Sequence, residues 1–182
     1  MAEGDPGCIH VRVWRKKPFP PIPSDHSQPL WETPEACRKA ILEFLPLANI
    51  VKISDEELEF ITGISDEPKA LEFLLQGDVE VIIYTKGTNG AEFITKERKV
   101  FSPSFRVQAQ DTTGAGDSFI GSFLYQVAED DNTLESLVNL SEEKIKEILT
   151  FSNATAALTV CKRGAIGALP TKEEVLALAQ GR

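Results

Sequence analysis

The chain has 182 residues, of which 28 are acidic and 19 are basic, so its formal net charge is −9. Hydrophobic residues make up 42% of the chain and charged residues 26%, which is typical of a globular domain with a sizeable core. A chain this acidic is a poor partner for nucleic acid or for an anionic membrane surface. No apolar run approaches the roughly 20 residues that a membrane span needs. We therefore expect neither a nucleic-acid partner nor a membrane protein.

The cysteine pattern and the N-terminal residues indicate in which cellular compartment the protein is expected. Cys8, Cys37 and Cys161 are an odd number at wide spacing, which fits neither a disulfide framework nor a zinc site. The N-terminus has no basic segment followed by an apolar stretch, so it does not resemble a secretory signal. These features predict a cytoplasmic protein with free thiols.

Residues 1–30 form a proline-rich arm. Six of the eleven prolines fall between residues 18 and 34, and such a stretch cannot hold a helix or a central strand. Alternating apolar residues at 9–14 allow one short strand within it. We expect the arm to be disordered, and a polyproline II ligand is the alternative that its composition leaves open.

From residue 31 onward, helical and strand patterns alternate. Thr33-Pro34 predicts a helix start, Ser54 and Glu57 have the spacing of a capping box, and Gly63 predicts the end of that helix. The expected strands cover 48–53, 79–85 and 91–95, with an extended segment at 101–107, and the expected helices cover 34–45, 54–62, 68–76, 114–128, 142–160 and 171–180. This alternation predicts an α/β layer fold with a largely parallel sheet.

A glycine-rich turn opens the helix at 114–128. Gly114, Ala115 and Gly116 have little or no side chain, so their backbone N–H groups can approach an anion at the positive end of the helix dipole. Asp117 follows within the first turn, where its carboxylate could accept a proton from an incoming hydroxyl. A glycine-rich loop with an acidic residue favoured by the dipole explains the same spacing without any chemistry.

The segment Asp-Thr-Thr-Gly-Ala-Gly-Asp at 111–117, continued by Ser118-Phe119-Ile120-Gly121, resembles the C-terminal signature of the ribokinase/PfkB carbohydrate kinase family. Segments 29–31 and 48–60 are similar to plant-type fructokinases, and the resemblance extends over residues 28–182. It implies the C-terminal part of a ribokinase-like three-layer sandwich, with 31–182 as the nucleotide-binding half. It also implies ATP-dependent phosphorylation of D-fructose to fructose 6-phosphate, with Mg²⁺ and, in members that use it, K⁺. Ser122 departs from the signature, which usually has Ala or Gly there.

The resemblance assigns roles to individual residues. Asp117 matches the catalytic base, and Gly114, Ala115 and Gly116 match the anion hole. Asp111 and Thr113 match potassium-site positions, and Glu57 matches the glutamate of the family's Asn-x-x-Glu motif, which governs magnesium and phosphate binding. Ser54 stands where that motif has Asn. The positions that match nucleotide-binding segments are Lys86, Gly87, Asn89, Gly90, Asn153 and Gly164.

Several of these positions have a purely structural alternative. Glu57 could serve only as the third residue of a capping box, Gly87 and Gly90 could serve only a tight turn, and Asn153 could be a surface helix residue.

The resemblance also leaves two functions open. The first is an ATP-dependent fructokinase in shortened form, because family members are nearly twice as long as this chain. Such a shortened chain would lack the sugar-binding half, expose an edge strand and tend to self-associate or form a homodimer. The alternative is a catalytically dead nucleotide-binding or interaction fragment.

Overall fold

The computed structural model describes residues 12–14, 33–129 and 133–181. The chain divides into two compact units, Met1–Ile82 and Ile83–Arg182, each described below by itself. The strands follow the order β1-β2-β3-β4-β5 in the sheet, and the division falls within β3 (Val81–Thr85).

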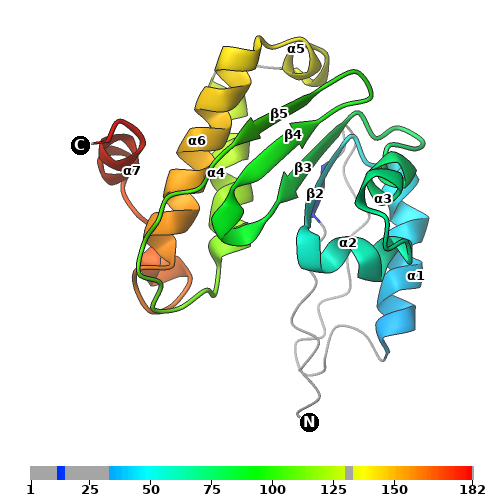
Figure 1. Cartoon of the computed structure of the whole chain (residues 1–182), viewed down its shortest axis with the longest axis horizontal. Helices are drawn as coiled ribbons and strands as arrows, with labels where there is room; N and C mark the ends of the chain where they lie inside the picture. Colours follow the sequence, from blue (N-terminus) through cyan, green and yellow to red (C-terminus); the bar gives the residue numbers. More distant parts are fainter. Residues whose placement is uncertain (1–11, 15–32, 130–132, 182) are drawn as a thin grey trace. The chain divides into compact units, whose positions relative to one another are not determined.

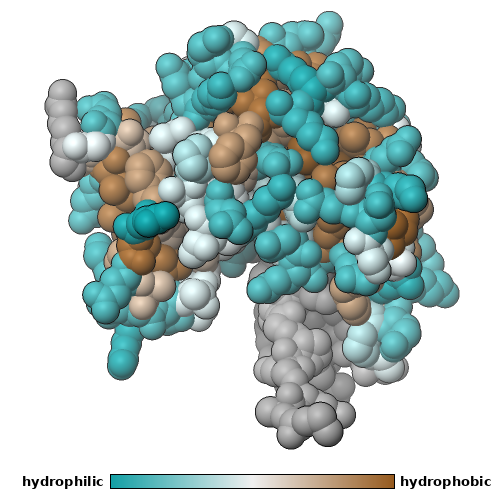
Figure 2. Space-filling view, viewed as in Figure 1, coloured by the Kyte–Doolittle hydropathy of each residue, from teal (hydrophilic) through white to brown (hydrophobic). Residues whose placement is uncertain are grey.

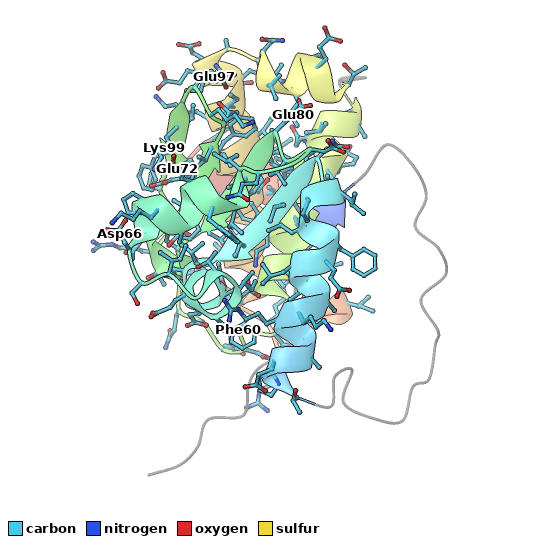
Figure 3. The ribbon with its side chains drawn as sticks, turned by 90° about the vertical axis from the view of Figure 1, so that its right-hand side faces the viewer. Phe60, Asp66, Glu72, Glu80, Glu97 and Lys99 are labelled. Carbon is cyan, nitrogen blue, oxygen red and sulfur yellow. The ribbon has the colours of Figure 1, made fainter. Side chains whose placement is uncertain are left out.

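The first unit places helices against the strand β2 (Ile50–Ser54). Its other elements are β1 (Arg12–Trp14), α1 (Pro34–Phe44), the 3₁₀ turn η1 (Leu45–Leu47), α2 (Asp55–Thr62), α3 (Glu67–Leu74) and the start of β3. The strand β1 pairs with β2 in antiparallel register, with Val13 opposite Val51. Figure 3 labels Asp66, whose carboxylate accepts a hydrogen bond from the Lys69 N–H at the start of α3.

The C-terminal end of α2 is held by an arginine from α1. Gly63 follows α2 with φ of +71°, the left-handed conformation that ends many helices. The Arg38 guanidinium donates hydrogen bonds to Ile61 O at 2.9 Å and to Thr62 O at 3.0 Å, two carbonyls with no partner further along the helix. Helices α1 and α2 are therefore joined through backbone groups as well as through apolar packing.

The second unit packs helices on a β-hairpin. Its elements are the rest of β3, η2 (Gly87–Asn89), β4 (Ala91–Ile94), β5 (Lys99–Ser102), α4 (Ala115–Glu129), α5 (Leu134–Val138), α6 (Glu142–Thr159), η3 (Ile166–Ala168) and α7 (Lys172–Ala179). Helix α6 packs on β4, β5, α4 and α7, and Figure 1 shows α4 and α6 next to each other on one side of the hairpin. Phe119, Phe123 and Val127 are buried along one stripe of α4.

Helix α7 is tied to α4 at the surface. Lys172 Nζ lies 3.0 Å from the Tyr125 hydroxyl oxygen and 3.0 Å from Glu129 Oε2, and the hydrogen bonds to these two groups raise the pKa of Lys172. Figure 2 shows apolar surface, in brown, over this end of the unit, where Leu169 and Leu176 are exposed. Because these ion pairs are solvated, packing on α6 contributes more than they do to holding α7.

The α/β class predicted from the sequence is confirmed, and most element positions agree within two residues. Two neighbouring pairs, β1–β2 and β4–β5, run antiparallel, so the sheet is mixed. The reason at β4–β5 is length, because residues 95–98 allow only a hairpin turn, which the Thr95 N–H closes on Arg98 O at 2.9 Å. The extended segment expected at 101–107 begins earlier, at Lys99, and loses its strand pairing after Ser102.

The structure bears only in part on the predictions for the proline-rich arm and for membrane-spanning segments. Of the proline-rich arm, only Arg12–Trp14 lies within the described residues, so its expected disorder falls outside them. No helix in the described ranges is both long enough and apolar enough to cross a membrane.

Candidate functional site

The glycine-rich turn places backbone amides and an acidic side chain at the start of α4. Gly114 has φ of +80°, and the Ser118 N–H is bonded to Gly114 O at 2.8 Å, which starts the helical pattern. The Ala115 N–H donates to Thr112 O at 3.2 Å, and the N–H groups of the next two residues lie in the first turn of α4, where the helix itself offers no carbonyl acceptor. Asp117 is exposed in this first turn. The predicted anion hole and the predicted base therefore share one helix end.

Gly114 also lies against the loop that follows α6. A Cβ added at Gly114 would be 2.9 Å from the Ala165 Cβ, closer than side chains approach one another. The positive φ and this close approach both require glycine at position 114. The glycine-rich turn at 114–116 and the loop at 162–165 are thus in direct contact.

Asp111 joins the same two loops through its carboxylate. Its Oδ1 accepts a hydrogen bond from the Thr113 N–H at 3.0 Å, and its Oδ2 accepts one from the Gly164 N–H at 3.0 Å. The bond from Gly164, followed by those from Thr113 and a weaker contribution from the Arg163 charge, lowers the pKa of Asp111 from 3.8 to about 2. Four positions predicted from the sequence, Asp111, Thr113, Gly114 and Gly164, are therefore brought together.

The predicted nucleotide-binding turn at 86–90 connects β3 and β4. The Lys86 N–H bonds to Gly90 O at 2.8 Å, and Gly90 has φ of +111°. Lys86 Nζ lies 2.8 Å from Glu92 Oε1 and 4.9 Å from the centre of the Tyr84 ring. The lysine side chain is thus engaged along the strands, and Gly87 and Asn89 are exposed in the turn. A nucleotide role for Lys86, Gly87, Asn89 and Gly90 stays a prediction.

Asn153 is a buried helix residue with structural partners. Its side chain is 4% exposed, which makes the surface-residue alternative wrong. Its amide nitrogen lies 3.1 Å from Ser102 O and 3.3 Å from Pro103 O, at the end of β5. Gly90 meets the same segment, because a Cβ there would be 2.3 Å from Ser102 O. Asn153 and Gly90 thus fix the end of β5, and contact between Asn153 and a nucleotide stays a prediction.

Sequence reasoning did not find the partners of Asn153. The Ser102 hydroxyl lies 3.0 Å from that of Thr150 and 3.4 Å from the Asn153 amide nitrogen. Ser102 is 2% exposed. The only sequence signal was a run of small polar residues inside an otherwise apolar helix pattern at 150–155, which suggests a buried polar contact without naming the partner.

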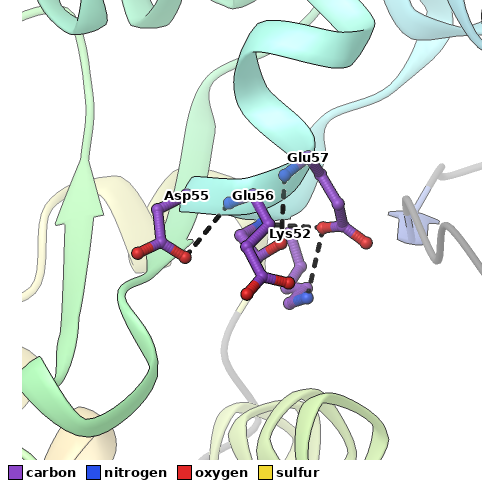
Figure 4. Close-up of polar contacts among 5 residues, drawn as sticks. Lys52, Asp55, Glu56 and Glu57 are labelled. Atoms are coloured by element: carbon purple, nitrogen blue, oxygen red, sulfur yellow. Dashed lines mark hydrogen bonds and ion pairs between the residues drawn. The ribbon is translucent and has the colours of Figure 1, made fainter. Parts of the chain in front are cut away.

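Glu57 belongs to the first unit, at the start of α2. The capping box is confirmed, since Glu57 Oε2 accepts a bond from the Ser54 N–H at 2.7 Å and Ser54 Oγ accepts one from the Glu57 N–H at 3.3 Å. Lys52 Nζ lies 3.5 Å from the same Glu57 oxygen (Figure 4). Sequence reasoning missed Lys52, although a lysine inside the apolar strand Ile-Val-Lys-Ile was a signal that a charge is buried there.

The described side chains contain no group of three or more His, Cys, Asp or Glu residues that could enclose a metal ion. Mg²⁺ in nucleotide sites is commonly held by one or two carboxylates together with phosphate oxygens and water. A single carboxylate such as that of Glu57 fits this arrangement, with the phosphates supplying the remaining ligands.

Comparison with known proteins identifies the family. Residues 23–172 match the model of the pfkB family carbohydrate kinases. "Probable fructokinase-2" from Arabidopsis thaliana is 42% identical over 151 residues, which are 82% of this chain and 44% of that protein. The chain thus spans about half the length of the curated relatives it matches.

Solved structures agree with this match. A fructokinase from Xylella fastidiosa with bound ATP has a TM-score of 0.74 and 32% identity, covering 84% of this chain and 48% of that one. A fructokinase from Vibrio cholerae O395, bound to fructose, ADP and calcium ion, has a TM-score of 0.69 and 28% identity, covering 81% and 46%. A helix opened by Gly114-Ala115-Gly116-Asp117, the α/β fold and these matches lead to one assignment: the chain belongs to the pfkB family of carbohydrate kinases.

Proposed function

We propose that this chain provides the nucleotide- and phosphoryl-binding part of an ATP-dependent fructokinase. The observation that carries the proposal is the start of α4, where the glycine-rich turn at 114–116 opens the helix and Asp117 is exposed beside it. Its support comes from relatives that are named fructokinases and from a similar structure that binds fructose and ADP.

The proposed reaction divides the work between the amides and the carboxylate. The 6-hydroxyl oxygen of fructose attacks the γ-phosphorus of ATP, the bond from that phosphorus to the β,γ-bridging oxygen breaks, and ADP leaves. The Asp117 carboxylate takes the hydroxyl proton, and the N–H groups of Gly114, Ala115 and Gly116 stabilise the charge on the transferring phosphoryl oxygens.

Different residues are proposed for the two cations, Mg²⁺ and K⁺. Mg²⁺ supplies charge neutralisation at the phosphates when bound, and Glu57 is the residue expected to act there. A carboxylate that stays ionised at neutral pH, as Asp111 does, suits a nearby K⁺, but both its oxygens already accept N–H bonds. Asp111 and Thr113 therefore stay predictions as K⁺ positions, as does a cytoplasmic location for the protein.

The test separates nucleotide binding from turnover. ATP is titrated into the folded chain in a calorimeter, and fructose-dependent ADP formation is followed in a coupled assay with Mg²⁺. Gly116→Asp should abolish ATP binding because it places a negative charge in the anion hole, whereas Gly121→Ala, on the exposed side of α4, should leave binding unchanged. ATP binding that survives Gly116→Asp would contradict the anion-hole assignment.

Asp117→Asn distinguishes the two functions that the sequence leaves open. In a fructokinase it should retain ATP affinity and lower kcat by about 10²–10⁴-fold, the usual contribution of a general base. ATP binding with no fructose phosphorylation by the parent chain would instead identify a nucleotide-binding fragment without catalysis.

A further inference from the structure

Lys52 is a charged residue inside a buried strand. It lies on β2 between Val51 and Ile53, which are both fully buried, and its own side chain is only 7% exposed. Lysine is rarely buried to this extent unless it is paired. Among the described residues its ammonium group has one ion-pair partner, Glu57 Oε2 at 3.5 Å (Figure 4).

This pair is poorly explained by stability alone. A separation of 3.5 Å is longer than the roughly 2.7–2.9 Å of a strong charge-assisted hydrogen bond, so the attraction recovers little of what the lysine loses in leaving water. The capping box does not need the lysine either, because an uncharged glutamine caps a helix in the same way. An apolar residue at position 52 would suit the strand better.

The pair distinguishes one carboxylate from its neighbours. Asp55, Glu56 and Glu57 all lie in the first turn of α2, but Asp55 and Glu56 are exposed. The Glu57 side chain is 13% exposed, with one oxygen fixed by both the Ser54 N–H and Lys52. Lys52 therefore helps to fix the orientation of the Glu57 carboxylate at the start of α2.

We propose that Lys52 is a positioning residue that acts through Glu57. Its ammonium group orients the Glu57 carboxylate at the start of α2, so that the carboxylate can bind the divalent cation of a metal–nucleoside triphosphate. The proposal rests on the proposed function, and it assigns Lys52 no contact of its own with the nucleotide.

The experiment measures how Mg²⁺ strengthens ATP binding, without any turnover. ATP is titrated calorimetrically into the full chain at a series of Mg²⁺ concentrations, for the parent, Lys52→Met, Lys52→Arg, Glu57→Gln and the Lys52→Met/Glu57→Gln double variant. Lys69→Met makes the same substitution at an exposed lysine of α3 and is the control. Urea unfolding of each variant reports its stability separately.

We expect Lys52→Met to weaken the apparent Mg²⁺ affinity by about 10-fold or more, as removal of residues that orient metal ligands usually does. Glu57→Gln should have a similar effect, the double variant should be no worse than the poorer single variant, and Lys52→Arg should recover most of the loss. Lys69→Met should match the parent.

Three results would overturn the proposal, and each identifies a different failure. If Lys52→Met folds and shows the parental Mg²⁺ dependence, Lys52 is only structural while the proposed function stands. If the folded parent binds no ATP at any Mg²⁺ concentration, the proposed function fails and the role of Lys52 fails with it. If Lys52→Met does not fold, Lys52→Arg decides, because a folded Arg variant whose Mg²⁺ dependence equals that of Glu57→Gln contradicts a role for the positive charge.

Discussion

At the scale of single residues, Asp111 connects segments that are far apart in the sequence. Its two carboxylate oxygens hold the N–H groups of Thr113 and Gly164, which is 53 residues away. The side chain lies at the surface, so the bonds depend on geometry more than on burial. The loop that opens α4 is thereby fixed to the loop that follows α6.

The pKa of Asp111 predicts how this connection responds to acid. Because folding lowers the pKa from 3.8 to about 2, the carboxylate stabilises the fold above pH 4, and this contribution is lost as the pH falls through about 2. Asp111→Asn removes the charge and replaces one of the two acceptor oxygens by an NH₂ group, so either the Thr113 or the Gly164 N–H loses its acceptor. The difference in unfolding free energy between parent and variant should therefore be larger at pH 5 than at pH 2.

Urea unfolding at both pH values measures this difference, and hydrogen exchange at the Thr113 or the Gly164 amide should be faster in the variant at pH 5. Asp78→Asn, at an exposed aspartate, serves as the control. An equal difference at the two pH values would show that the Asp111 charge does not support the fold.

At the scale of elements, α2 is defined at both ends by residues whose effects are local and separable. Ser54 and Glu57 satisfy its first N–H groups, and Gly63 with Arg38 satisfies its last carbonyls. A helix of eight residues is too short to persist by itself in water, so these ends and its packing on α1, α3 and β2 determine whether it forms.

Gly63→Ala should destabilise the first unit by about 1–2 kcal/mol, the usual cost of a left-handed alanine. The new Cβ would also lie 2.6 Å from Arg38 Nη2, although that end of the arginine can move. Gly63→Asn should cost less, because asparagine tolerates this conformation. Chemical denaturation measures both changes.

The matched control is Gly121→Ala in α4, which meets no atom within 4 Å and has no positive φ. This variant should be neutral or slightly stabilising, since alanine favours a helix interior. Equal losses at positions 63 and 121 would contradict the role assigned to the left-handed turn.

The same contrast between local and distant interactions explains what the sequence could predict. Thr33-Pro34, the Ser54–Glu57 box and Gly63 act within one turn of chain, and the helix ends they predict are confirmed. The short helix α5 was missed, because its five residues carry too little periodicity. The burial of Asn153 against Ser102 depends on how β5 packs on α6, which no local pattern specifies.

The candidate site divides along the same line. The glycine-opened start of α4 follows from neighbouring residues and from the family resemblance, so Gly114 and Asp117 could be named in advance. The burial of Lys52 beside Glu57 could not be predicted from the sequence, because the burial of β2 depends on the elements packed around it.

At the scale of the whole molecule, the exposed edge of strand β5 affects whether two copies of the chain associate. Among the described strands β5 pairs with β4 alone, and its side chains alternate, with Val100 and Ser102 buried and Lys99 and Phe101 exposed. Phe101 is 47% exposed on this edge. Exposed edges favour pairing with another chain, whereas edge lysines and a net charge of −9 oppose it.

We therefore predict weak self-association that increases with salt, as screening reduces the repulsion between acidic chains. Phe101→Lys should lower the association constant by removing apolar area and adding a second lysine to the edge. Leu169→Lys, at an equally exposed apolar residue outside any strand, should have a smaller effect. Static light scattering over a concentration series measures this, and a strictly monomeric parent at high salt would contradict it.

The contact between Gly114 and Ala165 limits which sequences the family fold can accept here. The two positions share one small volume, so the size of the residue at 165 is constrained by a loop 51 positions earlier, since 165 − 114 = 51. In a library that varies both positions, a side chain at 114 should be recovered only together with glycine at 165. For protein engineering, exposed Lys162, Arg163 and Ile166 can therefore be varied singly, while positions 114 and 165 have to be varied as a pair.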